Sequence, residues 1–389
     1  MRDVSRKLSY IEAVGADERS GHRSRVWAEI DLGAAARNFR AIRARADGRR
    51  VIAVVKANAY GHGAILFARA LSAERCDAFA VISVEEAAEL RAAGVREPLL
   101  VLGGPMAPAE ADRALALDAS LVVSRVEALD WLDAAAARAG RTADFQLELD
   151  TGMGRLGFAP DDLAAALAKI RAAKRLRLDG VMSHLACADD AASPETARQR
   201  ARFAELVGAV RAGGFAPSWV HLDNSAGLAR GATPGSDAVR PGISLYGIDP
   251  TLEGGHALEP VMSLFARVAH AKTVAAGTPI GYGGDWRAPE RSRVATLALG
   301  YADGLPRAAS GKIDVGLRGR RARVVGRISC DLAMAALPAD AQTAAGDVAL
   351  VFGRGEGMEI PVHELARAVG TISYEILVRI GPRVPRLPT

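Results

Sequence analysis

The sequence predicts an α/β plus β protein in which a (β/α)8 TIM barrel is followed by a mostly antiparallel β C-terminal domain. Before residue 256, short apolar runs alternate with alanine-rich helical stretches, which is typical of buried parallel strands that are each followed by a helix. Beyond that residue, glycine-rich turns separate the apolar runs with little helical pattern between them, which favours antiparallel strands. A doubly wound open sheet is the alternative for the first part, but no GxGxxG motif opens its first unit.

The predicted elements follow one another in a regular order. Residues 25–32 alternate apolar and polar side chains like a half-buried strand, and the helical stretch 33–46 follows. Eight apolar runs supply the barrel strands: 51–58, 78–84, 98–104, 120–125, 144–152, 178–186, 219–227 and 238–247. Helical patterns such as 83–95 and 161–173 lie between them. In the second part, strands are predicted within 264–274, 293–304, 321–330 and 347–355.

These elements divide the chain into three parts. Residues 1–24 are polar and charged, which predicts a flexible extension. Residues 33–255 form the predicted barrel. Residues 256–389 form the predicted β-rich domain.

Composition limits the class of protein. The 389 residues are 50% hydrophobic and 24% charged, as in ordinary globular proteins. No apolar run approaches the roughly 18 residues of a membrane span, and the first residues lack the apolar core of a secretory signal. Cys76, Cys187 and Cys330 lie far apart, without metal-ligand spacing, so we expect a cytoplasmic protein without a metal. The net charge of +5 is scattered and aromatic residues are few, which argues against nucleic-acid binding.

Polar residues follow several barrel strands, where barrel enzymes carry their chemistry. Lys56, one of only six lysines, follows four apolar residues at the end of the first strand. Burial there lowers a lysine pKa and favours a Schiff base, whereas the alternative is a lysine that extends to water. Arg155 follows the fifth strand in a glycine-rich turn and suits a carboxylate. His184 follows the sixth strand, where a buried structural histidine is the alternative.

The seventh and eighth strands end in a candidate phosphate site. Asn224 and Ser225 begin a helical stretch whose first N–H groups favour an anion, and Arg240, Gly242 and Ile243 follow the last strand. A lysine across the barrel mouth from a phosphate site predicts a phosphorylated carbonyl compound. Spacing alone leaves two interpretations open: an aldolase acting on a sugar phosphate, or a lysine that holds pyridoxal phosphate.

The motif AVVKANAYGHG around Lys56 resembles the pyridoxal-phosphate lysine motif of bacterial alanine racemases. Eight further segments resemble this family in the same order: LDTGMGRLG, SHLACAD, HLDNSAG, VRPGISLYG, IGYGG, GYADG-x-x-R, VGRISCD and TISYEILVRIGPRVPR. The resemblance extends from about residue 25 to residue 386. It implies a barrel plus a C-terminal β domain that includes the strand 25–32, and a head-to-tail homodimer.

The resemblance also implies an activity. The protein would be an isomerase that interconverts L-alanine and D-alanine by two-base transfer of the Cα proton on an aldimine of pyridoxal 5'-phosphate. Lys56 would form the aldimine and act as the base on D-alanine. Tyr282, contributed by the partner subunit, would act on L-alanine, so the two active sites would be shared across the homodimer.

Further site residues are implied by matching positions. The phosphate-binding set is Tyr60, Ser225, Gly242, Ile243 and Tyr374, with Asn224 beside it. His184 and Arg240 match a network behind Tyr282. The substrate-binding set is Arg155, which orients the carboxylate, Cys330, whose backbone assists, and Tyr301, which with Tyr374 narrows the entrance. Glu148 and Asp331 are supporting residues.

The implied place of Arg240 bears on the type of reaction. In the family this arginine faces the pyridine nitrogen, to which a guanidinium does not give up its proton. A pyridine nitrogen without a proton withdraws electrons more weakly. This favours simple removal and return of the Cα proton over side reactions such as transamination.

Three positions depart from the family pattern. Glu148 stands where many members carry a carbamylated lysine, and we expect its carboxylate to hold Arg155 directly. Cys330 stands where methionine is common, and Asp223 where a small apolar residue is common. These changes leave room for serine or another small amino acid as substrate.

Other protein classes compete with this interpretation. Decarboxylases of basic amino acids share the two-domain build, but they place an acidic residue where this chain has Arg240. A non-catalytic pyridoxal-phosphate carrier would lack the second domain. An aldolase would not account for the GYADG and TISYE segments.

Overall fold

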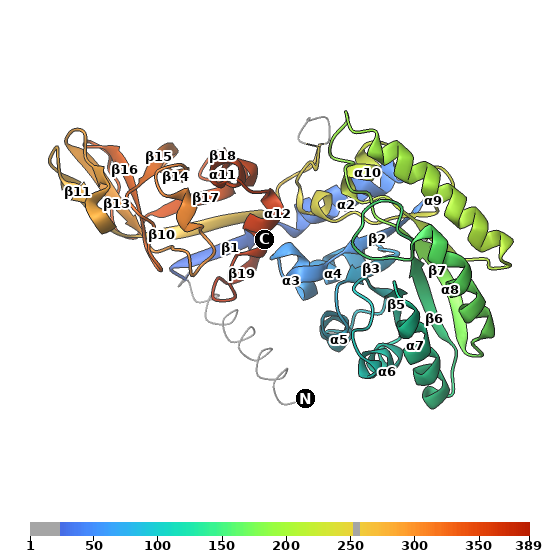
Figure 1. Ribbon diagram of the computed structural model, residues 1–389. Helices are drawn as coiled ribbons and strands as arrows, with labels where there is room; N and C mark the ends of the chain where they lie inside the picture. Colours follow the sequence, from blue (N-terminus) through green and yellow to red (C-terminus); the bar gives the residue numbers. More distant parts are fainter. Residues whose placement is uncertain (1–23, 252–256) are drawn as a thin grey trace. The chain divides into compact units, whose positions relative to one another are not determined.

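The computed structural model describes residues 24–251 and 257–389. The flexible extension predicted at residues 1–24 therefore lies, apart from Ser24, outside the described residues. Main-chain contacts divide the chain into two units, Ala34–Glu259 and the combination of Met1–Gly33 with Pro260–Thr389. The first unit is a barrel and the second is a β-rich domain, coloured blue to yellow and mainly orange to red in Figure 1.

Eight parallel strands close the barrel in chain order, which confirms the predicted fold class. They are β2 (Arg50–Val54), β3 (Ala78–Val81), β4 (Leu99–Val101), β5 (Ala119–Val123), β6 (Ala143–Glu148), β7 (Leu176–Met182), β8 (Trp219–His221) and β9 (Ala238–Val239). Strand β9 pairs with both β8 and β2 and so completes the ring. Every residue of β3 and β4 is buried, because strands covered by helices have no solvated face.

Helices follow the strands and cover the barrel (Figure 1). The longer ones are α2 (Leu32–Arg45), α4 (Ala64–Ala73), α5 (Val84–Ala92), α6 (Pro108–Ala116), α7 (Val126–Ala139), α8 (Pro160–Ala172) and α9 (Glu195–Ala212). The start of α5 is fixed by Ser83, whose hydroxyl accepts the N–H of Glu86. Helix α7 ends where Gly140 adopts φ 65°, a conformation that favours glycine. Among the described residues, no helix has both the length and the apolar character needed to cross a membrane.

The apolar runs are longer than the strands that form within them. Within the run 51–58 the strand ends at Val54, and within the run 219–227 the strand ends at His221. In each case the chain then turns into a short helix, α3 (Lys56–Tyr60) or α10 (Ser225–Ala229). Apolar side chains continue past the strands because the residues that come next, Val55 and Leu222, are buried as well.

The second unit is built on a nine-stranded sheet in the order β18-β17-β14-β15-β16-β13-β10-β1-β19. The strands are β1 (Val26–Ile30), β10 (Met262–Val274), β13 (Ser292–Leu297), β14 (Asp314–Leu317), β15 (Arg320–Val325), β16 (Ala333–Pro338), β17 (Val348–Gly355), β18 (Met358–Ile360) and β19 (Arg386–Pro388). All neighbours are antiparallel except β1 and β19. Trp27 on β1 stacks on its cross-strand partner Phe265 of β10, with ring centroids 5.5 Å apart.

Two helices of this unit lie where no helical pattern was expected. They are α11 (Val362–Val369) and α12 (Ser373–Val378). Helix α11 has apolar residues at positions 362, 365, 366 and 369, the spacing of one helix face, so the sequence does hold this signal. Helix α12 has only six residues, which is too short to reveal a helical period.

Candidate active site at the carboxyl ends of the barrel strands

Lys56 stands two residues beyond the end of β2 and begins a strained turn. Residues 57–60 all have φ between 48° and 55°, the left-handed region that L residues rarely adopt, at a cost of roughly 1–2 kcal/mol each. Glu86 holds this turn, because its carboxylate accepts the N–H of Ala57 at 2.8 Å and that of Ile82 at 2.9 Å. Backbone strain of this kind is typical of functional sites.

The surroundings of Lys56 favour an uncharged amine. Burial is the main cause that lowers its pKa, and the positive charges of Arg155 and Arg240 lower it further. The carboxylate of Glu86 acts in the opposite direction. A lysine amine with a lowered pKa can act as a nucleophile or a base.

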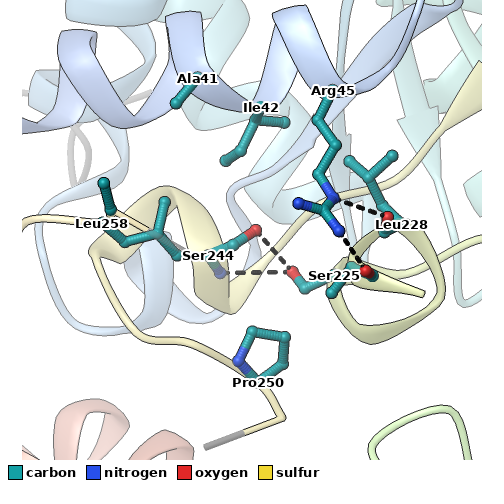
Figure 2. Close-up of a pocket in the computed structure, with 10 residues that line it drawn as sticks. Ala41, Ile42, Arg45, Ser225, Leu228, Ser244, Pro250 and Leu258 are labelled. Carbon is teal, nitrogen blue, oxygen red and sulfur yellow. Dashed lines mark hydrogen bonds between the residues drawn. The ribbon is translucent and has the colours of Figure 1, made fainter. Parts of the chain in front are cut away.

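Ser225, which follows β8, gathers hydrogen-bond donors from the residues that follow β9. Its Oγ accepts the N–H groups of Gly242 at 2.9 Å and Ser244 at 3.3 Å, and it lies 3.0 Å from the hydroxyl of Ser244. Figure 2 shows Ser225 and Ser244 facing each other beside a pocket whose other lining residues include Ala41, Ile42 and Leu258. Such a convergence of small donors suits an anion.

Gly242 leaves room for the hydroxyl of Tyr60. A Cβ at position 242 would lie 3.0 Å from that oxygen, closer than nearly all real contacts. Burial raises the pKa of Tyr60 to about 12, so its hydroxyl keeps its proton. Ile243 is fully buried behind this point. The side chain of Asn224 is used inside the loop, where it accepts the N–H of Gly227 at 2.9 Å.

Arg240 is buried and held by two imidazoles and by backbone carbonyls. It donates to Nδ1 of His221 and, at 3.3 Å, to Nδ1 of His184. A guanidinium only donates, so both rings accept at Nδ1 and carry their proton on Nε2. Nε2 of His221 then donates to Oε1 of Gln146 at 2.6 Å. This network spans β6, β8 and the loops after β7 and β9.

Both histidines are neutral in this network. Burial and the nearby charge of Arg240 lower the pKa of His184 to about 3 and that of His221 well below its usual value. Burial also lowers the pKa of Arg240, to about 10, which still leaves the guanidinium charged near neutral pH.

Glu148 ends β6 as a buried carboxylate, and burial raises its pKa against the opposing effect of Arg240 and Arg155. The direct contact expected between Glu148 and Arg155 is not made: within the described chain, Oε2 of Glu148 has no hydrogen-bond partner, and no ion pair joins it to Arg155. Arg155 is exposed in the turn after β6. The short glutamate side chain stays inside the barrel, so it acts on Arg155 through charge and not through contact.

The predicted residues of the second unit lie on its turns. Tyr282 is at the tip of the hairpin of β11 (Pro279–Ile280) and β12 (Trp286–Arg287), with 71% of its surface exposed. Tyr301 follows β13 and is half-exposed, Cys330 is an exposed free thiol after β15, and Tyr374 lies on α12.

Backbone contacts join the turns of Tyr301 and Cys330. The N–H of Tyr301 donates to the carbonyl of Ser329, and that of Ala302 to the carbonyl of Cys330 at 3.0 Å. A Cβ at position 300 would lie 2.2 Å from the same carbonyl of Cys330, so only glycine fits there. The two turns therefore form one closely packed structure.

A buried aspartate fixes this structure. Asp303 is fully buried and accepts the N–H of Gly300 at 2.8 Å and a donor of Arg383 at 2.7 Å. Arg383 also donates to Asp331 at 2.8 Å and is the main cause that lowers the pKa of that carboxyl. Asp331 is thus tied to Asp303 through one arginine.

The barrel brings one group of predicted residues together. Arg155 and Arg240 lie close enough to Lys56 and His184 for their positive charges to lower the pKa of both. The predicted residues Tyr282, Tyr301, Cys330, Asp331 and Tyr374 belong to the other unit.

Sequence reasoning missed Glu86, Gln146, His221 and Asp303. Three of them had a signal. Glu86 stands three residues after Ser83, the spacing of a helix capping box. His221 and Asp303 stand inside the quoted HLDNSAG and GYADG segments.

The barrel carries a lysine at a strand end, a buried arginine, and the hydrogen-bond donors around Ser225 that suit an anion. A β domain is part of the same chain. Together these features define the class of barrel enzymes that work with a phosphorylated cofactor. Family models of the alanine racemase N-terminal and C-terminal domains match residues 30–250 and 261–388. The chain therefore belongs to the alanine racemase family.

Individual relatives agree over nearly the whole chain. The alanine racemase of Desulforamulus reducens is 40% identical over 367 residues, which cover 93% of this chain and 98% of that protein. The structure of the alanine racemase from Streptomyces lavendulae has a TM-score of 0.89 at 38% identity, covering 95% of this chain and 98% of that chain. The structure from Bartonella henselae has covalently bound pyridoxal phosphate, with a TM-score of 0.85 at 29% identity, covering 94% and 100% of the two chains.

Proposed function

We propose that this chain interconverts L-alanine and D-alanine with pyridoxal phosphate held in the barrel. The observation that carries the proposal is Lys56, which lies at the barrel mouth with a lowered pKa, in a family whose Bartonella henselae member holds this cofactor covalently. Alanine racemase is the name of the curated relatives that cover nearly the full chain.

The residues present fit the cofactor. Its phosphate would be held by the donors that converge at Ser225 and Gly242, with the protonated hydroxyl of Tyr60 as a further donor. Gly242 supports this fit, because a side chain there would meet the hydroxyl of Tyr60. Lys56 would hold the carbonyl carbon, and Arg240 the ring nitrogen.

Pyridoxal phosphate, when bound, withdraws electrons from the Cα of an amino acid and so makes the Cα proton acidic. Arg240 limits that withdrawal, because its guanidinium keeps its proton at neutral pH. This arrangement favours simple removal and return of the proton.

Two bases move the proton. The amine of Lys56 takes the proton on one face of Cα, the face used with D-alanine, and the ammonium formed in this way can return it there. The phenol of Tyr282 of the partner subunit serves the opposite face, with His184 behind it. Since Nδ1 of His184 accepts from Arg240, its Nε2–H is the group that can donate to the phenolic oxygen.

Arg155 binds the substrate carboxylate, and the backbone beside Cys330 assists. The exposed guanidinium of Arg155 is unpaired in the described structure, and Glu148 lies close enough to interact with it electrostatically. Tyr301 and Tyr374 narrow the entrance to a size that fits a small side chain. Because each site takes residues from two chains, the working form is a homodimer, which we place in the cytoplasm.

Borohydride labelling tests the role of Lys56. Treatment of the purified protein with borohydride, followed by digestion and mass spectrometry, is expected to place a pyridoxyl group on the peptide that contains Lys56. Lys56→Ala should carry none. Lys169→Ala is the matched control, because Lys169 pairs with Asp130 on the outer helices and should leave the label unchanged. A label on another lysine, or no label in the wild type, would contradict the proposal.

A further inference from the structure

Asp223 is a fully buried carboxylate that the proposed reaction does not use. It stands between β8 and Ser225. Its Oδ2 accepts the N–H of Thr233 at 2.7 Å, and its Oδ1 accepts the hydroxyl of the same residue at 2.8 Å. The two ends of the segment 223–233 are therefore closed onto each other by one side chain.

Arg200 joins this closed segment to helix α9. Its Nη2 donates to Oδ1 of Asp223 at 3.2 Å and to the carbonyls of Gly227 at 3.1 Å and Gly231 at 2.5 Å. A buried aspartate costs several kcal/mol unless a cation and hydrogen bonds compensate it. Arg200 supplies the cation and Thr233 supplies hydrogen bonds. The ion pair of Arg200 with Asp223 therefore stabilises this arrangement of the segment.

The neighbouring residue of α9 has a parallel role on other loops. Gln199 is buried, accepts the N–H of Ala186 at 2.9 Å and donates to the carbonyl of His184 at 2.9 Å and the hydroxyl of Thr151 at 3.2 Å. One turn of α9 thus holds the loops that follow β6, β7 and β8.

The segment 223–233 contains Ser225, the residue around which the donors of the candidate phosphate site converge. Ser225 lies two residues after Asp223, and its Oγ meets the N–H of Gly242. The backbone carbonyl of Asp223 accepts the N–H of Arg240 at 2.8 Å. On the opposite side, Arg45 of α2 donates to the carbonyl of Leu228, as Figure 2 shows, and also to that of Ala229. The position of Ser225 is therefore set between two arginines from two outer helices.

We infer that Asp223 and Arg200 are positioning residues that set the affinity of the protein for the phosphate group of pyridoxal phosphate. They act through Ser225: with the pair intact, its hydroxyl stays against the backbone of Gly242. The inference rests on the proposed function, since it concerns the same cofactor. It assigns to the pair no part in proton transfer.

The test compares two ligands that differ only in the phosphate. Full-length protein stripped of cofactor is titrated with pyridoxal phosphate and with pyridoxal, and both Kd values are measured by absorbance. Asp223→Asn, which removes the charge and one acceptor, is expected to raise Kd for pyridoxal phosphate about tenfold and Kd for pyridoxal less than about twofold.

Asp77→Asn is the matched control. Asp77 likewise accepts a backbone N–H, that of Val51 at 2.8 Å, and pairs with Arg43 at 2.9 Å, but at the amino ends of the barrel strands. Both Kd values should stay unchanged in this variant. Arg200→Lys is a second, milder variant for the case in which Asp223→Asn does not fold, and it should shift the same ratio of Kd values.

The outcomes separate the two claims. If the wild-type chain binds no pyridoxal phosphate, the proposed function fails. Suppose instead that the wild type binds pyridoxal phosphate. The inference on Asp223 and Arg200 is overturned if the Asp223→Asn or Arg200→Lys protein binds it equally well. It is also overturned if the variant loses affinity for pyridoxal phosphate and for pyridoxal to the same degree.

Discussion

The histidines around Arg240 give the barrel a dependence on pH. Both stay neutral in the folded protein because burial and the guanidinium oppose a second positive charge. Their Nδ1 atoms accept from Arg240, and protonation of either ring would break that contact. The arrangement that fixes Arg240 therefore depends on two uncharged rings.

We expect the unfolding free energy to fall as the pH falls below about 6.5. The pKa of His184 is about 3 when folded and near 6.5 when unfolded, so only the unfolded chain binds the proton between these values. Between about pH 6.5 and pH 5 this costs roughly 2 kcal/mol. Glu148 acts with the opposite sign, because its raised pKa stabilises the fold at low pH and that stability is lost as the pH rises.

Urea unfolding at several pH values measures this dependence. His184→Gln removes the titrating ring, so its unfolding free energy should fall less steeply with acid than that of the wild type. Equal slopes for the two proteins would show that His184 is protonated in the folded state.

Glu148 is expected to affect substrate binding through its charge. Glu148→Gln removes the attraction on Arg155 and keeps the size of the side chain, so KM for alanine should rise about threefold with little change in kcat. Steady-state kinetics with both enantiomers measure the effect. Asp144→Asn, which alters an exposed pair with Arg177 on the outside of β6 and β7, is the control and should leave KM unchanged. A KM that is unchanged in Glu148→Gln would remove Glu148 from the substrate site.

At the scale of single elements, the strained turn after β2 is the most unusual feature. Ala57 has φ 52°, where an L residue is strained and glycine is not. Ala57→Gly is therefore expected to raise the unfolding free energy by about 1 kcal/mol. The same change at Ala88, inside α5, should lower it by about 1 kcal/mol. Denaturant unfolding measures the change in unfolding free energy for each variant. The two changes have opposite signs if the left-handed turn exists, and the same sign if it does not.

The sequence predicts well those elements whose conformation is set by their own residues. Each barrel strand comes from a short apolar run, such as 78–84 for β3, and each outer helix from an alanine-rich stretch, such as 83–95 for α5. The conformation of the left-handed turn is not set by its own residues. Its sequence, KANAY, holds alanines that favour an ordinary helix, and Glu86 on another element holds it in place.

Site residues follow the same division. Lys56 stands out because a charged side chain directly follows an apolar run, and Arg155 because it lies in the glycine-rich turn after one. Gln146 is polar within a buried strand and could be recognised only once β8 brings His221 to it. The expected contact of Glu148 with Arg155 is absent, because the sequence gives the order of these residues and not the reach of their side chains.

At the scale of the whole molecule, the proposed function requires two chains. In that proposal, Lys56 would come from one barrel and Tyr282 from the second unit of the partner, so each site would need residues of both chains. The exposure of Tyr282 on its hairpin tip is consistent with a side chain that contacts a partner.

Subunit mixing tests this arrangement. Lys56→Ala and Tyr282→Phe proteins should each be inactive as homodimers. After the two are unfolded and refolded together, about half the dimers hold one chain of each kind, and each of these has one intact site. Activity should return to about a quarter of the wild-type value. If both residues of a site came from one chain, mixing would restore nothing.

Proton NMR with L-alanine in D₂O, with chiral analysis of the same sample, tests the central claim most directly. Proton transfer at Cα by Lys56 and Tyr282 predicts that the Cα–H signal disappears while D-alanine forms, and that Lys56→Ala shows neither change. A Cα–H signal that persists with the wild-type protein would contradict the proposed racemisation of alanine.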